Sequence, residues 1–443
     1  MIFGGFHSMH GRLAPVDAHS VDSPPGTVDD VRPTVLLVGC GMSADFREWI
    51  VESISRHYRI WLMDHRPLTW ARPYVIGHTE IDALDLDKAL TAAAALQRSV
   101  SLAGVVCYDE MRIWSAARIA EELGLPTSPA DAVLACRDKK TSRERMAAAG
   151  TPQARSLFVR SLDEARSAVE EVGYPAILKP RDLAASEGVA RVDGPDELAR
   201  WFSFTAEAAG IPGDGSTESG ILVEEYLDGP EIAVDVVVYD GQVTPVVVSH
   251  KQLGYPPSFE EVGHFVAADD PLLHDAELLT VLESAHSALG FTHGVSHVEL
   301  RLTKTGPRVI EVNARLGGDL IPYLGLLATG VDLARAAADL AVGRRPDLTP
   351  RRSLAAAIRF LYPDSDLVVE SIEIAPHRLP RGIWRAVPVA EPGEKLLLPP
   401  RAFVIGRAAL GIAFGTDAED CARVLDDLPQ AVTVRGQAIP STP

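Results

Sequence analysis

Apolar residues occur in short uninterrupted runs in the first third of the chain, and amphipathic segments separate these runs. The runs cover residues 34–38, 59–64 and 102–107. Runs of this length are typical of buried strands in a parallel sheet, and the segments between them have helical spacing. The alternation predicts a parallel α/β domain over residues 31–136. Residues 1–30, rich in Gly, Pro, Ser and His without periodicity, are predicted to be a flexible arm.

The first run ends in Gly39-Cys40-Gly41, a turn that could open a dinucleotide-binding fold with Asp64 as the ribose-binding acid. The third glycine of that fingerprint is missing, because Asp45 and Phe46 stand in its place. A Gly-x-Gly pair alone is more often an ordinary turn between a strand and a helix. NAD is therefore not predicted.

The pattern of apolar and polar positions changes from about Asp131. A helix over residues 141–149 is ended by Gly150 and Pro152, and further strands and helices follow. Residues 201–220 are polar and Gly-rich, which predicts a surface excursion, and residues 250–267 are predicted to be a loop that covers the substrate. The remaining predicted elements are a strand at 156–159, a helix at 162–172, a strand ending at Lys179, a polar loop at 181–189, and strands at 221–225, 232–239 and 243–249.

A predicted hairpin between residues 293 and 319 carries the most chemistry. Residues 296–302 and 308–313 alternate between apolar and polar positions on either side of a turn. If the hairpin is symmetric about Thr305, Glu299 lies directly across the ladder from Glu311, and Ile310 and Val312 lie on the opposite, aliphatic face. Two carboxylates opposite each other destabilise a ladder.

A divalent cation between Glu299 and Glu311 would remove this repulsion, and Asn313 adds a neutral oxygen on the same face. Three hard oxygen donors suit Mg²⁺ or Mn²⁺ held jointly with phosphates. Arg315 and the close-approach backbone of Gly317-Gly318 follow, and they suit an anion. The alternative is a solvated hairpin face that tolerates the like-charge pair, but the anion-binding residues beside it favour a metal–phosphate site.

Two lysines stand where an anion would explain them. Lys179 closes an apolar strand, although it could simply reach from the strand end to solvent. Lys139 opens a helix, where its charge opposes the helix dipole unless a phosphate lies near. The loop at 184–189 is small and hydroxylated enough to fold over phosphates. The stretch 223–231 leaves a strand into a turn, so its backbone can meet an adenine edge and an acid can accept from ribose hydroxyls.

Composition narrows the partners. The 443 residues include 42 Lys and Arg against 61 Asp and Glu, a formal charge of −19 that repels nucleic acid. A few local cations can still bind a small anion. No apolar run approaches the roughly 20 residues that cross a bilayer, and the first residues lack a secretory signal. We therefore expect a cytoplasmic protein without nucleic-acid or membrane partners, and its four separated cysteines, Cys40, Cys107, Cys136 and Cys421, are expected to be reduced thiols.

Over residues 33–345 these pieces resemble, in type and order, the ATP-grasp superfamily and within it the carboxylate–amine ligases that include the L-amino acid (dipeptide) ligases. The most specific part is the Glu-x-Asn-x-Arg block that begins at Glu311. The resemblance rests on Asp138-Lys139 with Arg143, residues 175–180, Ser186-Glu187-Gly188-Val189, residues 223–231, Glu299 and residues 311–319.

The resemblance implies an ATP-grasp fold that combines α/β and α+β parts. It comprises a Rossmann-like pre-ATP-grasp domain over residues 31–136, a lid subdomain over 137–220 and a larger sheet domain over 221–349. The nucleotide would lie between the last two. Residues 350–443 are not covered by the resemblance, and their pattern predicts a mostly β C-terminal domain with Pro-rich turns.

The resemblance also implies roles for particular residues. Arg315 would stabilise the transferred phosphoryl group, and Glu187 departs from the small or polar residue that many relatives carry in their phosphate loop. The implied ligands are Lys139, Lys179, Ser186 and Gly188 for ATP phosphates, with Lys179 also near adenine; Glu224, Glu225, Tyr226 and Leu227 for adenine; Glu231 for ribose; and Glu299, Glu311 and Asn313 for two Mg²⁺ ions.

The implied activity is ATP-dependent joining of a carboxylate to an amine through an acyl phosphate, with release of ADP and phosphate, by a homodimer. Arg315 and Lys179 are the predicted catalytic residues. Arg315, Gly317, Gly318, His297, His264 and Lys251 are the candidates for binding the acid substrate. For His264 the plainer alternative is a loop histidine without a role, and for His297 a satisfied polar neighbour.

Two other functions stay open at this point. One is a different ATP-grasp chemistry, such as a carboxylase that uses bicarbonate or a purine-pathway ligase. The other is a nucleotide-binding protein without catalysis, against which the complete set of metal and phosphate ligands argues.

Overall fold

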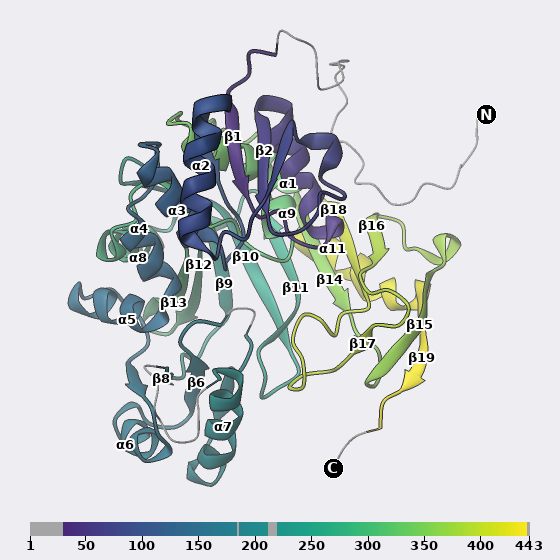
Figure 1. Ribbon diagram of the computed structural model, residues 1–443. Helices are drawn as coiled ribbons and strands as arrows, with labels where there is room; N and C mark the ends of the chain where they lie inside the picture. Colours follow the sequence, from purple (N-terminus) through teal and green to yellow (C-terminus); the bar gives the residue numbers. More distant parts are fainter. Residues whose placement is uncertain (1–29, 184–185, 211–218, 441–443) are drawn as a thin grey trace.

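The computed structural model describes residues 30–183, 186–210 and 219–440, and within these ranges the strands form four sheets (Figure 1). The predicted N-terminal arm lies outside the described residues except for Asp30, and so do Ala184 and Ala185 of the predicted phosphate loop. None of the described helices combines the length and the apolar character that a membrane crossing needs.

The N-terminal part is a parallel sheet in the order β3-β2-β1-β4, as the alternating pattern predicts. Leu36 and Val38 of β1 pack towards α2 and α3, whereas Val35 and Leu37 pack towards α1, so β1 is buried on both faces. The elements are β1 (Thr34–Val38), α1 (Ala44–His57), β2 (Arg59–Asp64), β3 (Gly77–Glu80), α2 (Leu86–Val100), β4 (Leu102–Val106) and α3 (Ile113–Glu122).

The lid is an antiparallel sheet in the order β5-β8-β6-β7, and α6 and α7 pack on it. Strand β8 pairs with both β5 and β6, so the predicted boundary between residues 220 and 221 cuts a strand out of the lid sheet. The surface excursion predicted for residues 201–220 is also wrong for residues 201–208, because these form the end of helix α7. The elements are β5 (Ser156–Val159), α6 (Leu162–Val172), β6 (Ala176–Pro180), β7 (Ala190–Val192), α7 (Pro195–Ala208) and β8 (Ile221–Glu225).

The central sheet has eight strands in the order β13-β12-β9-β10-β11-β14-β18-β16. One face of β9 packs against α4, α5 and α8, and the other contributes Val237 to the core beneath α9 and α10. Its first strands are β9 (Glu231–Tyr239), β10 (Gln242–Gly254), β11 (Glu260–Ala267), β12 (Gly294–Thr303) and β13 (Gly306–Asn313). The helices are α4 (Ala130–Arg137), α5 (Lys139–Ala148), α8 (Ala276–Leu289), α9 (Ile321–Thr329) and α10 (Leu333–Ala341).

Two predictions about this sheet need correction. Residues 250–267 are not a covering loop, because most of them form the paired ends of β10 and β11. The C-terminal region is mostly β as predicted, but three of its strands extend the central sheet through the pairing of β11 with β14. These strands are β14 (Ala355–Leu361), β16 (Ile383–Pro388) and β18 (Ala409–Gly415).

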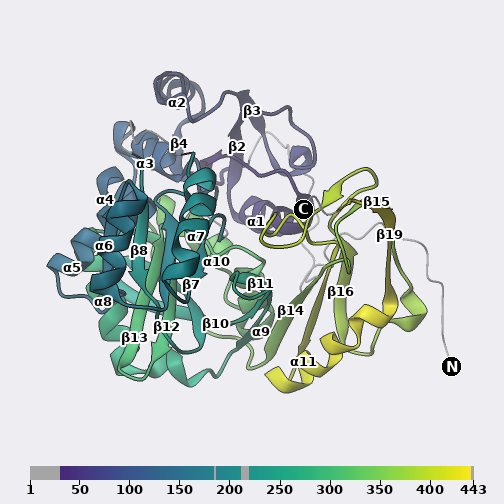
Figure 2. The same ribbon diagram turned by 90° about the horizontal axis from the view of Figure 1, so that it is seen from below.

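The remaining C-terminal strands form a small sheet in the order β17-β15-β19, and α11 packs on β14 and β18. Figure 2 shows the lid at the left, over the half of the central sheet that carries β12 and β13, and the small sheet at the right, beyond β16 at the other end. The elements are β15 (Leu367–Ile374), β17 (Lys395–Leu396), α11 (Ala418–Asp426) and β19 (Val432–Ala438).

Candidate nucleotide and metal site

The hairpin of β12 and β13 places Glu299 directly across from Glu311, as predicted. The reason differs from the prediction, because the turn pairs Thr303 with Gly306 and the hairpin is not symmetric about Thr305. A β-bulge between Glu299 and Leu300 restores the register by leaving one extra residue, Ile310, on β13.

The bulge also corrects the predicted face of Ile310. Val309 takes the buried core position, and Ile310 lines the cavity beside Glu311. The main-chain oxygen of Ile310 accepts hydrogen bonds from Arg143 at 2.8 Å and from Lys179 at 3.5 Å. The irregularity in the strand therefore supplies an acceptor to two of the cations that surround the cavity.

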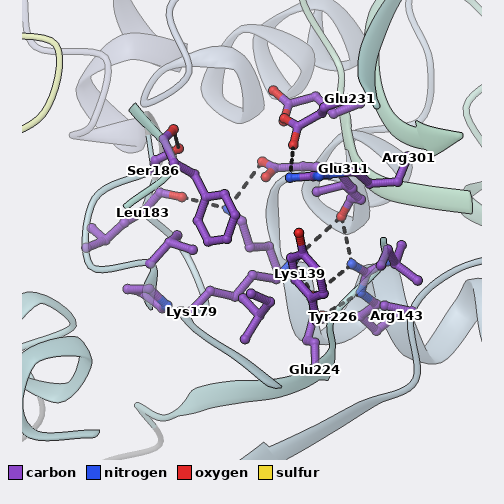
Figure 3. A pocket seen from close by; sticks show the side chains of 18 of the residues that line it. Lys139, Arg143, Lys179, Leu183, Ser186, Glu224, Tyr226, Glu231, Arg301 and Glu311 are labelled. Atoms are coloured by element: carbon purple, nitrogen blue, oxygen red, sulfur yellow. Dashed lines mark hydrogen bonds and ion pairs between the residues drawn. The ribbon is translucent and has the colours of Figure 1, made fainter. Parts of the chain in front are cut away.

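This cavity lies between the lid and the central sheet and encloses about 960 Å³, including its open mouth (Figure 3). Lys139 lies at its centre, and its ammonium donates to the Leu183 carbonyl at 2.6 Å and pairs with Glu311 at 3.2 Å. The predicted residues that line it are Lys139, Lys179, Ser186, Glu224, Glu225, Tyr226, Leu227, Glu231, Glu299, Glu311, Asn313 and Arg315.

On the lid side, two cations share one buried carboxylate. Glu224 accepts from Arg143 at 2.6 Å and from Lys179 at 2.8 Å. Burial alone would raise the pKa of Glu224, but Arg143 and Lys179 lower it to about 2. Burial lowers the pKa of Lys179 despite Glu224. Within this group of three, two basic side chains face one carboxylate, which suits an incoming anion.

On the hairpin side, the acids outnumber the bases. Lys251 is buried and its ammonium lies 2.7 Å from Glu261, 3.0 Å from Glu299 and 3.2 Å from Glu231. Burial would lower the pKa of Lys251, but these carboxylates raise it well above its ordinary value. Arg301 pairs with Glu231 at 2.9 Å. Lys251, predicted as a substrate ligand, is thus placed as the internal counter-ion of the acids.

The donor set on this side fits a divalent cation. The side chains of Glu299 and Glu311 keep 22% and 18% of their surface exposed. Each is paired with a lysine ammonium group, Glu299 with Lys251 and Glu311 with Lys139. Carboxylate oxygens of Glu231, Glu261 and Glu299 also lie within 4.8 Å of one another. Converging carboxylates with an amide oxygen nearby are the ligands that Mg²⁺ and Mn²⁺ prefer.

The remaining predicted residues do not line the cavity. Gly188 has a φ of +70°, and a Cβ there would lie 2.6 Å from the Ala208 side chain, so its backbone packs closely against α7. His297 is buried and contacts Asp235 at 2.7 Å. A Cβ at Gly317 would lie 2.7 Å from that His297 ring, whereas Gly318 has open space around it.

His264 is fully buried in a polar network rather than lying on a loop. Its Nε2 atom lies 3.2 Å from Glu261 and 3.3 Å from Asp319. Burial would lower the pKa of His264, but Asp319 and Glu261 raise it. Asp319 also receives two hydrogen bonds from Arg407, at 2.7 and 2.8 Å.

Sequence reasoning missed Glu261 and Arg407. Arg407 stands in the C-terminal region, 88 residues beyond Asp319. The single signal that could have found Glu261 is its position three residues before His264.

Comparison with known proteins defines the class first. Residues 172–323 match the model of the ATP-grasp domain, and residues 64–127 match that of the ATP-grasp N-terminal domain. These matches show that the chain carries an ATP-grasp domain and an ATP-grasp N-terminal domain, and the Glu-x-Asn-x-Arg block lies on the wall of the cavity within that part.

Individual relatives narrow this class. The chain is 30% identical over 295 residues to an uncharacterized protein, y4rH, of Sinorhizobium fredii, covering 66% of this chain and 60% of that protein. It is 30% identical over 275 residues to human carnosine synthase 1, covering 59% of this chain and 33% of that protein. Alanine–anticapsin ligase of Bacillus subtilis strain 168 is 28% identical over 311 residues, covering 61% of this chain and 64% of the ligase. The chain thus spans between a third and two thirds of these relatives.

Solved structures share the fold. An L-amino acid ligase from Bacillus licheniformis superposes with a TM-score of 0.76 at 22% identity, covering 92% of this chain and 99% of that one. A biotin carboxylase domain from Hydrogenobacter thermophilus, solved with MgADP and bicarbonate, superposes with a TM-score of 0.66 at 17% identity, covering 91% of both chains. The fold is common to ligases and carboxylases, so the choice between them depends on the site.

Proposed function

We propose that this chain is an ATP-dependent carboxylate–amine ligase that forms an amide or peptide bond through an acyl phosphate and releases ADP and phosphate. The observation that carries the proposal is the pairing of Glu299 with Glu311 on the wall of a cavity whose opposite wall holds Lys179. The relatives named as ligases of amino acids support the amine as second substrate.

The charges of the cavity support separate roles for its basic and acidic side chains, the first in binding phosphates and the second in binding metal. Lys139 and Lys179 would neutralise phosphate oxygens, and Glu299, Glu311 and Asn313 would hold Mg²⁺ or Mn²⁺. When bound, the metal supplies positive charge to the transferring phosphoryl group. Ser186, Glu225, Tyr226, Leu227 and Glu231 are the proposed contacts to the rest of ATP.

Arg315 is the proposed catalytic cation for the acyl phosphate. It lines the cavity, and its Nε donates to Glu110 at 2.5 Å. Burial alone would lower the pKa of Arg315, but Glu110 and the hairpin carboxylates raise it, so the guanidinium stays charged. A substrate carboxylate attacks the γ-phosphate and ADP leaves, and the amine then attacks the acyl carbon and displaces phosphate. The proton that the amine loses passes to solvent.

The test is a substrate screen with the purified full chain, ATP and MgCl₂. Pairs of L-amino acids and, separately, bicarbonate are supplied, and ADP, phosphate and new amides are measured by coupled assay and mass spectrometry. We expect stoichiometric ADP, phosphate and amide with at least one pair. ADP formation that depends on bicarbonate instead would favour the carboxylase alternative, and ATP binding without turnover would favour a non-catalytic protein.

Two ions per active site, the homodimer and the cytoplasmic location stay predictions. Native mass spectrometry of the chain, with and without MgADP, measures the first two directly.

A further inference from the structure

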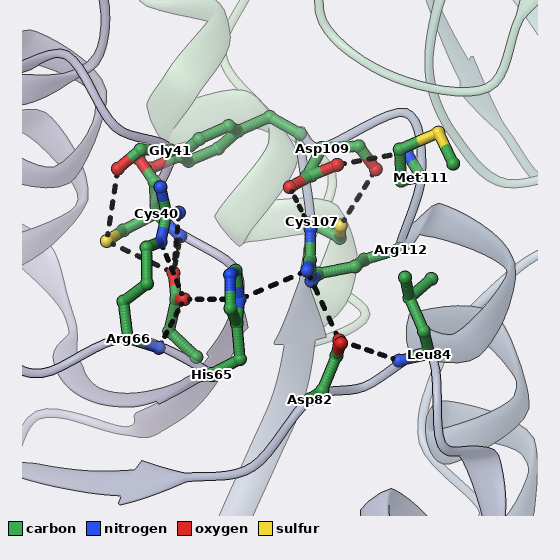
Figure 4. A network of polar contacts seen from close by, with 12 residues as sticks. Cys40, Gly41, His65, Arg66, Asp82, Leu84, Cys107, Asp109, Met111 and Arg112 are labelled. Carbon is green, nitrogen blue, oxygen red and sulfur yellow. Dashed lines mark hydrogen bonds and ion pairs between the residues drawn. The ribbon is translucent and has the colours of Figure 1, made fainter. Parts of the chain in front are cut away.

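The carboxyl edge of the N-terminal sheet carries a dense polar network in which the charges are paired (Figure 4). Arg66 contacts Asp64 at 3.2 Å, and Arg112 contacts Asp109 at 2.9 Å and Asp82 at 3.2 Å. Arg315, which reaches this edge from the central domain, is paired with Glu110. These contacts satisfy each of the three arginines with a carboxylate.

Arg47 is different. It lies in the first part of α1, half-buried, with its guanidinium 5.3 Å from the centre of the Tyr108 ring. Within the described residues no carboxylate lies at salt-bridge distance from it. Asp109 and Asp319 are the acids that influence it, and they are already bound to Arg112 and Arg407 respectively. Arg47 is thus a surplus cation beside paired acids.

The position of Arg47 is also costly without an anion. A cation near the start of a helix opposes the helix dipole. Ser43, the residue that precedes α1, makes no side-chain capping hydrogen bond, so the first amide groups of α1 lack that acceptor. Burial lowers the pKa of Arg47, and the neighbouring Arg315 lowers it further. An anion bound there would relieve all three costs.

The geometry holds Arg47 in place. Tyr108 donates from its hydroxyl to the Cys40 carbonyl at 3.0 Å, which fixes the ring beneath the guanidinium. Gly41, with a φ of +81°, lets the chain pass the arginine closely, since a Cβ at that position would lie 3.1 Å from Arg47 Cγ. The side chain is therefore positioned in advance and does not need to be ordered by a ligand.

We propose that Arg47 binds a substrate carboxylate that ATP does not activate, and that this is the α-carboxylate of an amino acid serving as the amine substrate. The inference rests on the proposed ligase function. Arg47 does not line the nucleotide cavity, whereas Arg315 does and also lies close enough to affect Arg47. A substrate that reaches from Arg315 towards Arg47 would present its reacting group at the first arginine and its free carboxylate at the second.

The test compares free amino acids with their α-carboxamides as the amine substrate, using a donor acid identified in the screen. For the wild-type chain we expect kcat/KM to be at least about tenfold higher for the free acid, because a charge-assisted hydrogen bond is lost in the amide. In Arg47→Gln this preference should fall towards one, through a higher KM for the acid, while the amide is used as before. Arg47→Lys keeps the positive charge but loses the planar guanidinium that can bind a carboxylate with two hydrogen bonds. This variant should retain part of the preference for the free acid.

Arg56→Gln is the matched control, because Arg56 stands on the same helix, exposed and paired with Glu52. It should keep the wild-type preference. A second comparison, with aspartate and asparagine as the donor acid, tests whether Arg47 binds a carboxylate of the donor instead. If Arg47→Gln loses only the preference for aspartate over asparagine, Arg47 is assigned to the donor acid and not to the amine substrate.

The outcomes separate the two proposals. If no pair is ligated by the wild-type chain, the proposed function fails and this inference fails with it. If the wild-type chain ligates but Arg47→Gln keeps the preference for the free acid in both comparisons, only the inference is overturned. An equal loss of activity with acid and amide would show that Arg47 merely supports the fold, and the thermal midpoint of the variant would confirm this.

Discussion

The two walls of the nucleotide cavity carry opposite charge. At the lid side Lys179 of β6 and Arg143, which reaches across from α5, share one carboxylate, Glu224. On the hairpin wall three carboxylates surround Lys251, with Arg301 beside Glu231 and His264 beside Glu261. The lid wall is suited to an anion and the hairpin wall to a cation. A triphosphate with its metal ions presents both charges, so this asymmetry explains the cavity better than a generic acidic surface does.

The hairpin wall is tested most strongly by Glu311→Ala. Because the change removes a proposed metal ligand, we expect the rate of ADP formation to fall at least about 100-fold, the scale of losing one key electrostatic contact in an active site. Metal-dependent ATP binding, measured by calorimetry, should weaken too. Glu283→Ala, on an exposed position of α8, is the control and should behave as wild type. Unchanged turnover in Glu311→Ala would refute the site assignment.

The Lys251→Met variant tests whether Lys251 neutralises the carboxylates of the hairpin wall when no metal is bound. Removing a buried partner leaves the carboxylates unpaired, which costs about 3–5 kcal/mol of the free energy of unfolding. Added Mg²⁺ should recover more stability in this variant than in the wild-type chain, because an ion can replace the ammonium. The exposed Lys304→Met is the control, with a change within about 0.5 kcal/mol. A variant as stable as wild type without metal would contradict the comparison.

The lid wall should respond to acid. The pKa of Glu224 is lowered from 4.5 to about 2, so its charged form stabilises the folded state above pH 4.5 and this stabilisation is lost as the pH falls towards 2. The contribution is about 3 kcal/mol on this scale. Denaturant unfolding between neutral pH and pH 3 should therefore show a steeper loss for wild type than for Glu224→Gln. Parallel curves would mean that the lid cations do not depend on this carboxylate.

The smallest effect is expected at Glu187, where the family resemblance implies a small or polar residue. The side chain is exposed at the cavity rim, and within the described residues it forms no ion pair. Glu187→Ser should change the KM for ATP by only about twofold, since an exposed charge is screened by solvent and salt. A change of about 20-fold in the KM for ATP, measured by steady-state kinetics, would contradict this expectation and indicate that the loop contacts the phosphates directly.

The sequence was informative where the signal is local. Alternation predicted the N-terminal parallel sheet, which is confirmed. The predicted pairing of Glu299 with Glu311 is also observed, but a bulge produces it and not the symmetric turn on which the prediction rested. The bulge at Ile310 could not be predicted, because one extra residue in a strand leaves no mark on composition and reveals itself only through pairing. That bulge decides which side chain faces the nucleotide cavity.

Contacts between distant segments were not predictable. Strand β8 closes the lid sheet because it pairs between β5 and β6, a choice made by tertiary packing. The bond of Arg407 to Asp319 depends on the C-terminal strands joining the central sheet, which no pattern around Arg407 indicates. Lys251 was predicted as a substrate ligand on a covering loop, yet the register of β10 places it among three acids.

The central claim is that a substrate carboxylate is activated by phosphoryl transfer in this cavity. The most direct measurement supplies the donor acid with oxygen-18 in its carboxylate and follows the label by mass spectrometry after one round of ligation. Attack of the carboxylate on the γ-phosphate predicts that one labelled oxygen leaves in inorganic phosphate and that ADP is the other product. Loss of the labelled oxygen to water, or its appearance in AMP with release of pyrophosphate in place of ADP and phosphate, would contradict the account.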